Sequence, residues 1–144
     1  MAQKTLLISA FLVLCVSTAC GGRCVPGALC NVSADDPQVL KVALSAAEAF
    51  NNQSNDSFLF RPGSVRRAQK QVVKGVRFLV DVDLFRTVCR KRDKPKNLLD
   101  CALQPPGPLH QVIRCHIEVW DVPWTHRKVV QKFYCKSANQ AQTG

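Results

Sequence analysis

The stretch DDPQVLKVALSAAEAFNN, Asp35 to Asn52, predicts the one long helix of this chain. Asp36 is a good N-cap, Pro37 suits the first helical position, and no glycine or proline interrupts the segment. Because small alanines dominate its apolar stripe, a sheet can approach closely, and we expect the helix to lie across a sheet. The stripe consists of Val39, Ala43, Ala46, Ala47 and Phe50.

After the helix, the period of the apolar residues changes to two, which is typical of β-strands. The segment between Cys89 and Leu109 is rich in prolines and lysines and predicts a loop. One helix followed by consecutive strands indicates an α+β domain with an antiparallel sheet. The expected strands are Arg66–Val73, Val76–Val88, Gln111–Val122 and, with weaker alternation, Val129–Cys135.

The first residues, MAQKTLLISAFLVLCVSTACGG, have the layout of a secretory signal peptide. Small residues favour cleavage after Ala19, with the end of the signal between residues 19 and 22. The apolar run of about 11 residues is shorter than the roughly 20 that span a membrane. We therefore expect a secreted protein, with endosomes or lysosomes as a second location. The expected domain covers residues 27–135, and a short tail covers 136–144.

The chain has eight cysteines, of which Cys15 and Cys20 fall in or beside the signal segment. An even number of remaining cysteines in a secreted chain predicts disulfide bridges. No C-x-x-C motif occurs and the three histidines lack ligand spacing, so we expect no metal and no cofactor. The remaining cysteines are Cys24, Cys30, Cys89, Cys101, Cys115 and Cys135.

The net charge of +10 raises the question of nucleic acid as a partner. The basic residues are scattered, and the run RKRDKPK, Arg90 to Lys96, has no aromatic residues interleaved with it. We therefore expect neither nucleic acid nor a membrane as partner, and the charge favours encounter with acidic surfaces. Glycosylation sequons begin at Asn31, Asn52 and Asn55, the last two being too close together for both to be modified easily.

Catalysis is not expected from this sequence. Cys115 and His116 are adjacent on a predicted strand, where neighbouring side chains point to opposite faces, so they do not form a nucleophile–base pair. The sequence contains no Gly-rich phosphate loop, paired catalytic carboxylates or metal-ligand cluster.

Two expected hairpin bends carry apolar residues instead of the usual polar ones. In QVVKG, Gln71 to Gly75, the glycine supplies the positive φ that a tight bend demands. In DVPWTH, Pro123 stiffens the bend and Trp124 projects from its tip. Such tips are typical of interface anchors. The alternative is that Trp124 folds back on the sheet and the two valines are ordinary strand residues.

These motifs resemble those of the cystatins. QVVKG is similar to their Q-x-V-x-G signature, VPW to their second-hairpin Pro-Trp, and the last four cysteines to those of secreted, type 2 members. FNNQSNDSFLF and QVVKG are most similar to the leukocystatin subgroup. From about Gly27 to Cys135, the resemblance implies a cystatin fold, with one helix across a twisted antiparallel sheet of about five strands. It also implies the bridges Cys89–Cys101 and Cys115–Cys135.

The resemblance implies a reversible, tight-binding inhibitor of papain-like cysteine proteases such as cathepsins. An N-terminal segment and the two hairpins would enter the protease cleft, with Gly27 flexible and Lys74 in a variable position that tunes partner preference. The implied contact residues are Val25, Pro26, Gly27, Gln71, Val72, Val73, Lys74, Gly75, Pro123 and Trp124. The alternative class is a cationic host-defence protein with a cystatin-like fold, although the tail SANQAQTG is uncharged.

The resemblance also implies a second site, at which Asn55 inhibits the asparagine-specific protease legumain. The alternative is a plain polar turn, and a glycan on Asn55 would block the site. Cys24 and Cys30 depart from the family pattern. They either close a ring around Gly27, link two chains into a homodimer, or remain reactive thiols.

Overall fold

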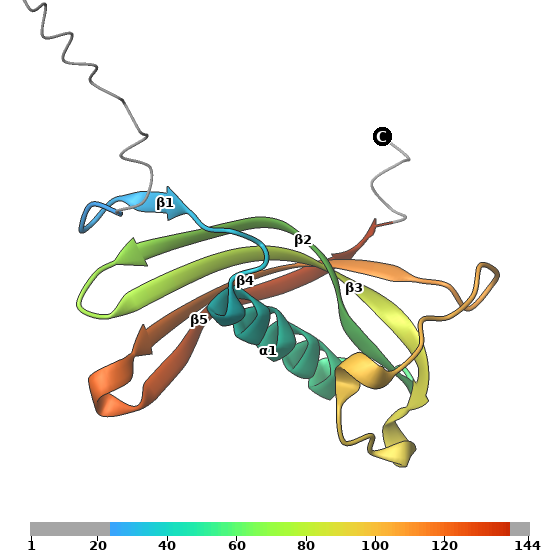
Figure 1. The fold of residues 1–144 in the computed structure, drawn as a ribbon. Helices are drawn as coiled ribbons and strands as arrows, with labels where there is room; N and C mark the ends of the chain where they lie inside the picture. Colours follow the sequence, from blue (N-terminus) through green and yellow to red (C-terminus); the bar gives the residue numbers. More distant parts are fainter. Residues whose placement is uncertain (1–23, 139–144) are drawn as a thin grey trace, which may run out of the picture.

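The computed structural model describes residues 24–138, so the expected signal peptide, Cys15, Cys20 and most of the expected tail lie outside it. One helix packs across a five-stranded antiparallel sheet whose strands follow chain order (Figure 1). This architecture confirms the predicted α+β class. The elements are β1 (Leu29–Asn31), α1 (Pro37–Gln53), β2 (Phe58–Val72), β3 (Val76–Arg90), β4 (Val112–Val122) and β5 (Arg127–Ser137).

The start of helix α1 matches the prediction from the sequence. The Asp36 side chain accepts a hydrogen bond of 2.8 Å from the backbone N–H of Gln38, and Pro37 occupies the first turn. The apolar stripe packs on one sheet face, with Phe50 only half-buried and Val42 as an additional buried member. The fully buried sheet residues against this helix are Phe60, Val80, Val82, Leu84 and Ile117.

Asn51 is a buried polar residue that the apolar pattern did not predict. Its side chain donates to the Phe60 carbonyl at 3.0 Å and accepts from the Phe60 N–H at 2.9 Å. Burial of an amide is tolerated when its hydrogen bonds are made, so this pair joins the end of α1 to the beginning of β2. A lone asparagine gives no periodic signal, which explains why the sequence did not reveal its role.

The prediction for the first long strand was wrong at its beginning. β2 begins at Phe58 and not at Arg66, and it runs through Pro62 and Gly63. Register shifts between Pro62 and Val65 mark a β-bulge, where proline and glycine are tolerated. A Cβ on Gly63 would lie 1.7 Å from the ring of Phe85, so the glycine makes room for that ring.

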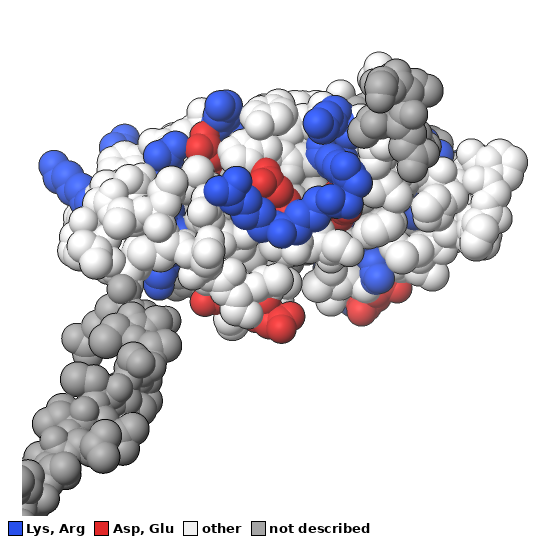
Figure 2. Space-filling view, turned by 90° about the horizontal axis from the view of Figure 1, so that it is seen from above, with Lys and Arg blue, Asp and Glu red and all other residues white. Residues whose placement is uncertain are grey.

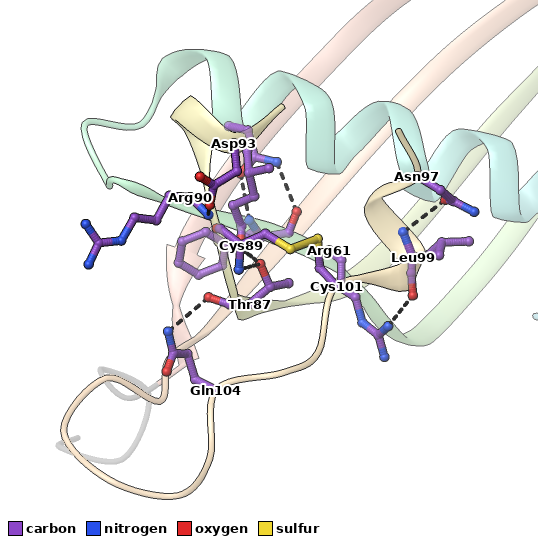
Figure 3. The surroundings of a disulfide bond; sticks show 12 residues. Arg61, Thr87, Cys89, Arg90, Asp93, Asn97, Leu99, Cys101 and Gln104 are labelled. Atoms are coloured by element: carbon purple, nitrogen blue, oxygen red, sulfur yellow. Dashed lines mark hydrogen bonds between the residues drawn. A yellow bond between two sulfur atoms is a disulfide. The ribbon is translucent and has the colours of Figure 1, made fainter. Parts of the chain in front are cut away.

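The predicted loop after β3 is held against the sheet by hydrogen bonds and a disulfide (Figure 3). Arg61 donates to the Leu99 carbonyl at 2.6 Å, and Gln104 donates to the Thr87 carbonyl at 3.0 Å. The two disulfide bridges implied by the resemblance are present as Cys89–Cys101 and Cys115–Cys135. Each of them contributes about 3 kcal/mol to the free energy of unfolding in a chain-entropy model.

Candidate functional site

Three segments meet at one end of the sheet: residues 24–28, the β2–β3 turn and the β4–β5 turn (Figure 1). These segments, together with Gln71 and Val72 at the end of β2, contain all the residues that the sequence placed in the candidate protease-binding surface. We call this end of the molecule the apolar edge.

The β2–β3 turn consists of Val73, Lys74 and Gly75. Gly75 has φ of +114°, as predicted, and Lys74 also has a positive φ of +42°. The Val73 N–H donates to the Gly75 carbonyl at 3.1 Å and closes the turn. Val72 and Val73 remain 36% and 38% exposed, although they stand beside a packed core.

The β4–β5 turn is a short 3-10 helix, Pro123–Thr125, closed by a 3.2 Å hydrogen bond from the His126 N–H to the Pro123 carbonyl. Trp124 projects from this turn and is 66% exposed. The alternative in which Trp124 folds back on the sheet is therefore wrong.

The two turns are braced against each other. Gly75 is buried, and a Cβ at its position would lie 2.6 Å from the carbonyl oxygen of Asp121. The Trp120 indole N–H donates to the Val73 carbonyl at 3.3 Å. The sequence did not identify Trp120, because alternation marks it only as a residue on the face away from the helix. Close approach at Gly75 and the indole hydrogen bond fix the spacing of the two turns.

The N-terminal segment is a closed ring, because Cys24 and Cys30 form a disulfide. Of the three alternatives left open by the sequence, the structure contains the ring, with each sulfur bonded to the other. Inside it, the Ala28 N–H donates to the Val25 carbonyl at 3.0 Å. Pro26 and Gly27, with φ of +84°, occupy the central positions of this turn, as in type II turns.

The ring is attached to the first hairpin. The Gly27 N–H donates to the Val72 carbonyl at 3.0 Å, and the Gln71 side-chain amide donates to the Gly27 carbonyl at 2.8 Å. Gly27 is therefore held in place, which differs from the flexible glycine implied by the resemblance. The side chain of Gln71 is occupied by this contact and by a 3.2 Å hydrogen bond from Arg77.

The apolar edge exposes apolar surface from all three segments. Exposed apolar side chains that gather at one end of a molecule are typical of a site that another protein covers. No helix within residues 24–138 is both long and apolar enough to cross a membrane. Over the same residues, no three His, Cys, Asp or Glu side chains gather as metal ligands would. The exposed apolar members are Val25, Pro26, Leu29, Val72, Val73, Pro123 and Trp124.

Asn55 lies at the other end of the molecule, in the exposed turn between α1 and β2. Asp56 accepts a hydrogen bond of 2.9 Å from the Phe58 N–H and pairs with Arg86. The Lys91 ammonium donates to the Ser54 carbonyl, so both sides of the turn are anchored. Asn55 is exposed at the tip of a fixed turn. The other sequon residues, Asn31 and Asn52, are exposed as well.

The comparisons with known proteins agree on one family. A cystatin domain model matches residues 27–124. Human cystatin-F is 38% identical over 78% of this chain and 77% of its own length, and mouse cystatin-F is 38% identical over 77% and 76%. The crystal structure of dimeric human cystatin F superposes with a TM-score of 0.71 at 37% identity, covering 80% of this chain and 90% of that one. The chain therefore belongs to the cystatin family, whose members are inhibitors of cysteine proteases and not enzymes.

Proposed function

We propose that this protein is secreted and binds reversibly and tightly to papain-like cysteine proteases of the cathepsin type, through the apolar edge. The observation that carries the proposal is the mutual bracing of the N-terminal ring and the two hairpin turns. A rigid surface loses little conformational entropy on binding, so its apolar contacts translate into affinity.

The proposed mechanism is steric. Val25 and Pro26 enter the substrate-side pockets, the β2–β3 turn lies over the catalytic cysteine, and Trp124 packs on the opposite side. The Val72–Gly75 backbone is held by β-hairpin hydrogen bonds and does not present a scissile carbonyl to the nucleophile. Lys74 is exposed at the tip of the turn, where it selects among proteases by charge.

Titration of papain with the protein lacking its signal peptide tests this proposal. We expect complete loss of activity at a one-to-one molar ratio, recovered on dilution as the complex dissociates. Papain that stays active with an excess of folded protein would overturn the proposal and favour the cationic host-defence alternative.

The disulfide ring gives a second expected result. Replacing both Cys24 and Cys30 by serine leaves the other two bridges intact and frees the N-terminal segment. Ordering the freed segment then costs free energy on binding, so we expect about tenfold weaker inhibition at unchanged stoichiometry. The inhibition constant for papain, measured for both proteins without reductant, checks this. Equal or tighter inhibition by the variant would show that the ring does not preorganise the segment.

We also propose that Asn55 inhibits legumain independently of the apolar edge. Two observations support this: the turn is exposed, and it is anchored through Asp56 and Lys91. Since legumain cleaves after asparagine, a fixed turn presenting Asn55 would bind as a slowly released substrate.

Two substitutions separate the asparagine from its sequon. Asn55→Gln removes both, and we expect at least about tenfold loss of legumain inhibition, because the specificity pocket loses its ligand. Ser57→Ala removes the sequon alone, so protein from glycosylating cells should inhibit legumain at least as well as the wild type. Papain inhibition serves as the control and should stay unchanged in both. Retained legumain inhibition by Asn55→Gln would refute the site.

A further inference from the structure

The sheet face away from α1 gathers basic side chains that are scattered in the sequence. Figure 2 shows this face, with Lys and Arg side chains forming an arc across it. The strand register brings residues from β2, β3, β4 and β5 onto the same side. We call the following six residues the basic band: Arg66, Arg67, Arg77, Arg114, Lys132 and Lys136.

Two of the three acidic residues on this face lie beneath the arginines, and the third, Asp81, is partly exposed and pairs with His116. Asp83 is only 6% exposed, and its carboxylate accepts a hydrogen bond of 2.8 Å from Arg66. Glu118 is 7% exposed and accepts one of 2.7 Å from Arg77. The carboxylates therefore orient the guanidinium groups, while the cationic groups occupy the outer surface. An anion approaching from solvent meets fixed positive charge first.

Three cations of the band are exposed and have no ion pair within residues 24–138: Arg67, Lys132 and Lys136. They stand on β2 and β5, which lie three strand spacings or about 14 Å apart. Between these two strands is a hollow of about 280 Å³. Three members of the band, Arg66, Arg114 and Lys136, line it together with Tyr134, His116 and the carboxylates of Asp81 and Asp83. The Tyr134 ring stacks on His116 with centroids 5.2 Å apart and is 53% exposed.

We propose that the basic band binds a linear sulfated polysaccharide. Its charge is complementary to rows of sulfate groups, and arginine offers a planar fork of donors to oxyanions. The band crosses the strands, so an extended chain would contact several cations at once. Apart from Arg77, which bonds to Gln71 beside the apolar edge, the band lies on a different surface, so this binding adds to protease inhibition and does not depend on it.

Other anionic partners fit the band less well. A membrane surface is bound by cations interspersed with apolar side chains that project into the lipid. The exposed aromatic residue between the cations of the band is Tyr134, and its ring stacks on His116 and does not project. The band therefore fits a membrane surface less well. Single-stranded nucleic acid is bound by a row of stacking aromatics, which the described part of this face does not offer.

Two triple variants of equal charge test the proposal. In the band variant, Arg67, Lys132 and Lys136 become glutamine. In the control variant, the same change is made at three exposed cations outside this face, Lys41, Arg92 and Lys96. Affinity for size-defined heparin is measured at several salt concentrations, since charge pairing makes binding salt-dependent. We expect at least about tenfold weaker binding and a shallower salt dependence for the band variant, with less than about twofold change for the control.

Further outcomes decide against the proposal. Equal losses in both triple variants would show that only net charge matters. Wild-type binding to desulfated heparin, or tighter binding to phosphatidylserine vesicles than to heparin, would assign the band to another partner. Papain inhibition by the band variant should equal that of the wild type, which establishes that the variant is folded.

Discussion

Replacing Trp124 by alanine is expected to weaken inhibition of papain about 100-fold. The side chain is 66% exposed on a closed 3-10 turn, so its large apolar surface is available and already positioned. Truncation of an interface anchor that becomes buried on binding typically costs about 2 kcal/mol or more. Since each 1.4 kcal/mol is a factor of ten in affinity, the expected 100-fold loss corresponds to about 2.8 kcal/mol. The measurement is the inhibition constant, with most of the change in the dissociation rate.

Tyr134 provides the matched control for this prediction. It is also an exposed aromatic residue, at 53%, but it lies on the sheet face away from α1. Tyr134→Ala should leave the inhibition constant within about twofold, because interface contacts and not exposed aromatic surface in general determine affinity. Comparable losses in the two variants would contradict the assignment of Trp124 to the contact surface.

The sequence was most informative where local patterns decide structure. The cap at Asp36, the alternation in β3 and the bend at Gly75 each depend on near neighbours in the chain. The beginning of β2 was misplaced because Pro62 and Gly63 usually end strands, and only the partner strand shows that they form a bulge.

Contacts between distant segments could not be predicted from the sequence. The hydrogen bond from Gln71 to Gly27 and the one from the Trp120 indole to Val73 depend on how three segments meet at one end of the sheet. The spacing of Cys24 and Cys30 was compatible with a ring or with a dimer. The basic band likewise becomes a single surface only through the strand register.

Gly75→Ala is expected to reduce both inhibition and stability. The residue has φ of +114°, which an L side chain rarely adopts, and its Cβ would lie 2.6 Å from the backbone oxygen of Asp121. Because that oxygen belongs to β4, the β2–β3 turn must move away from it, and the hydrogen bond from Trp120 to Val73 would be strained or lost. We expect a loss of about 1–3 kcal/mol in unfolding free energy and at least tenfold weaker inhibition of papain.

Gly107→Ala separates the two causes of this expected loss. Gly107 also has a positive φ, +150°, but no atom lies within 4 Å of the position where its Cβ would be. Its substitution therefore introduces backbone strain but no steric clash of the new Cβ with a neighbouring atom. Gly107 also lies in a loop outside the apolar edge. We expect it to lower the unfolding free energy while leaving the inhibition constant unchanged, as measured by denaturant unfolding and papain titration. If Gly75→Ala also left inhibition unchanged, the spacing of the two hairpin turns would not determine affinity, and bracing could not be the basis of inhibition.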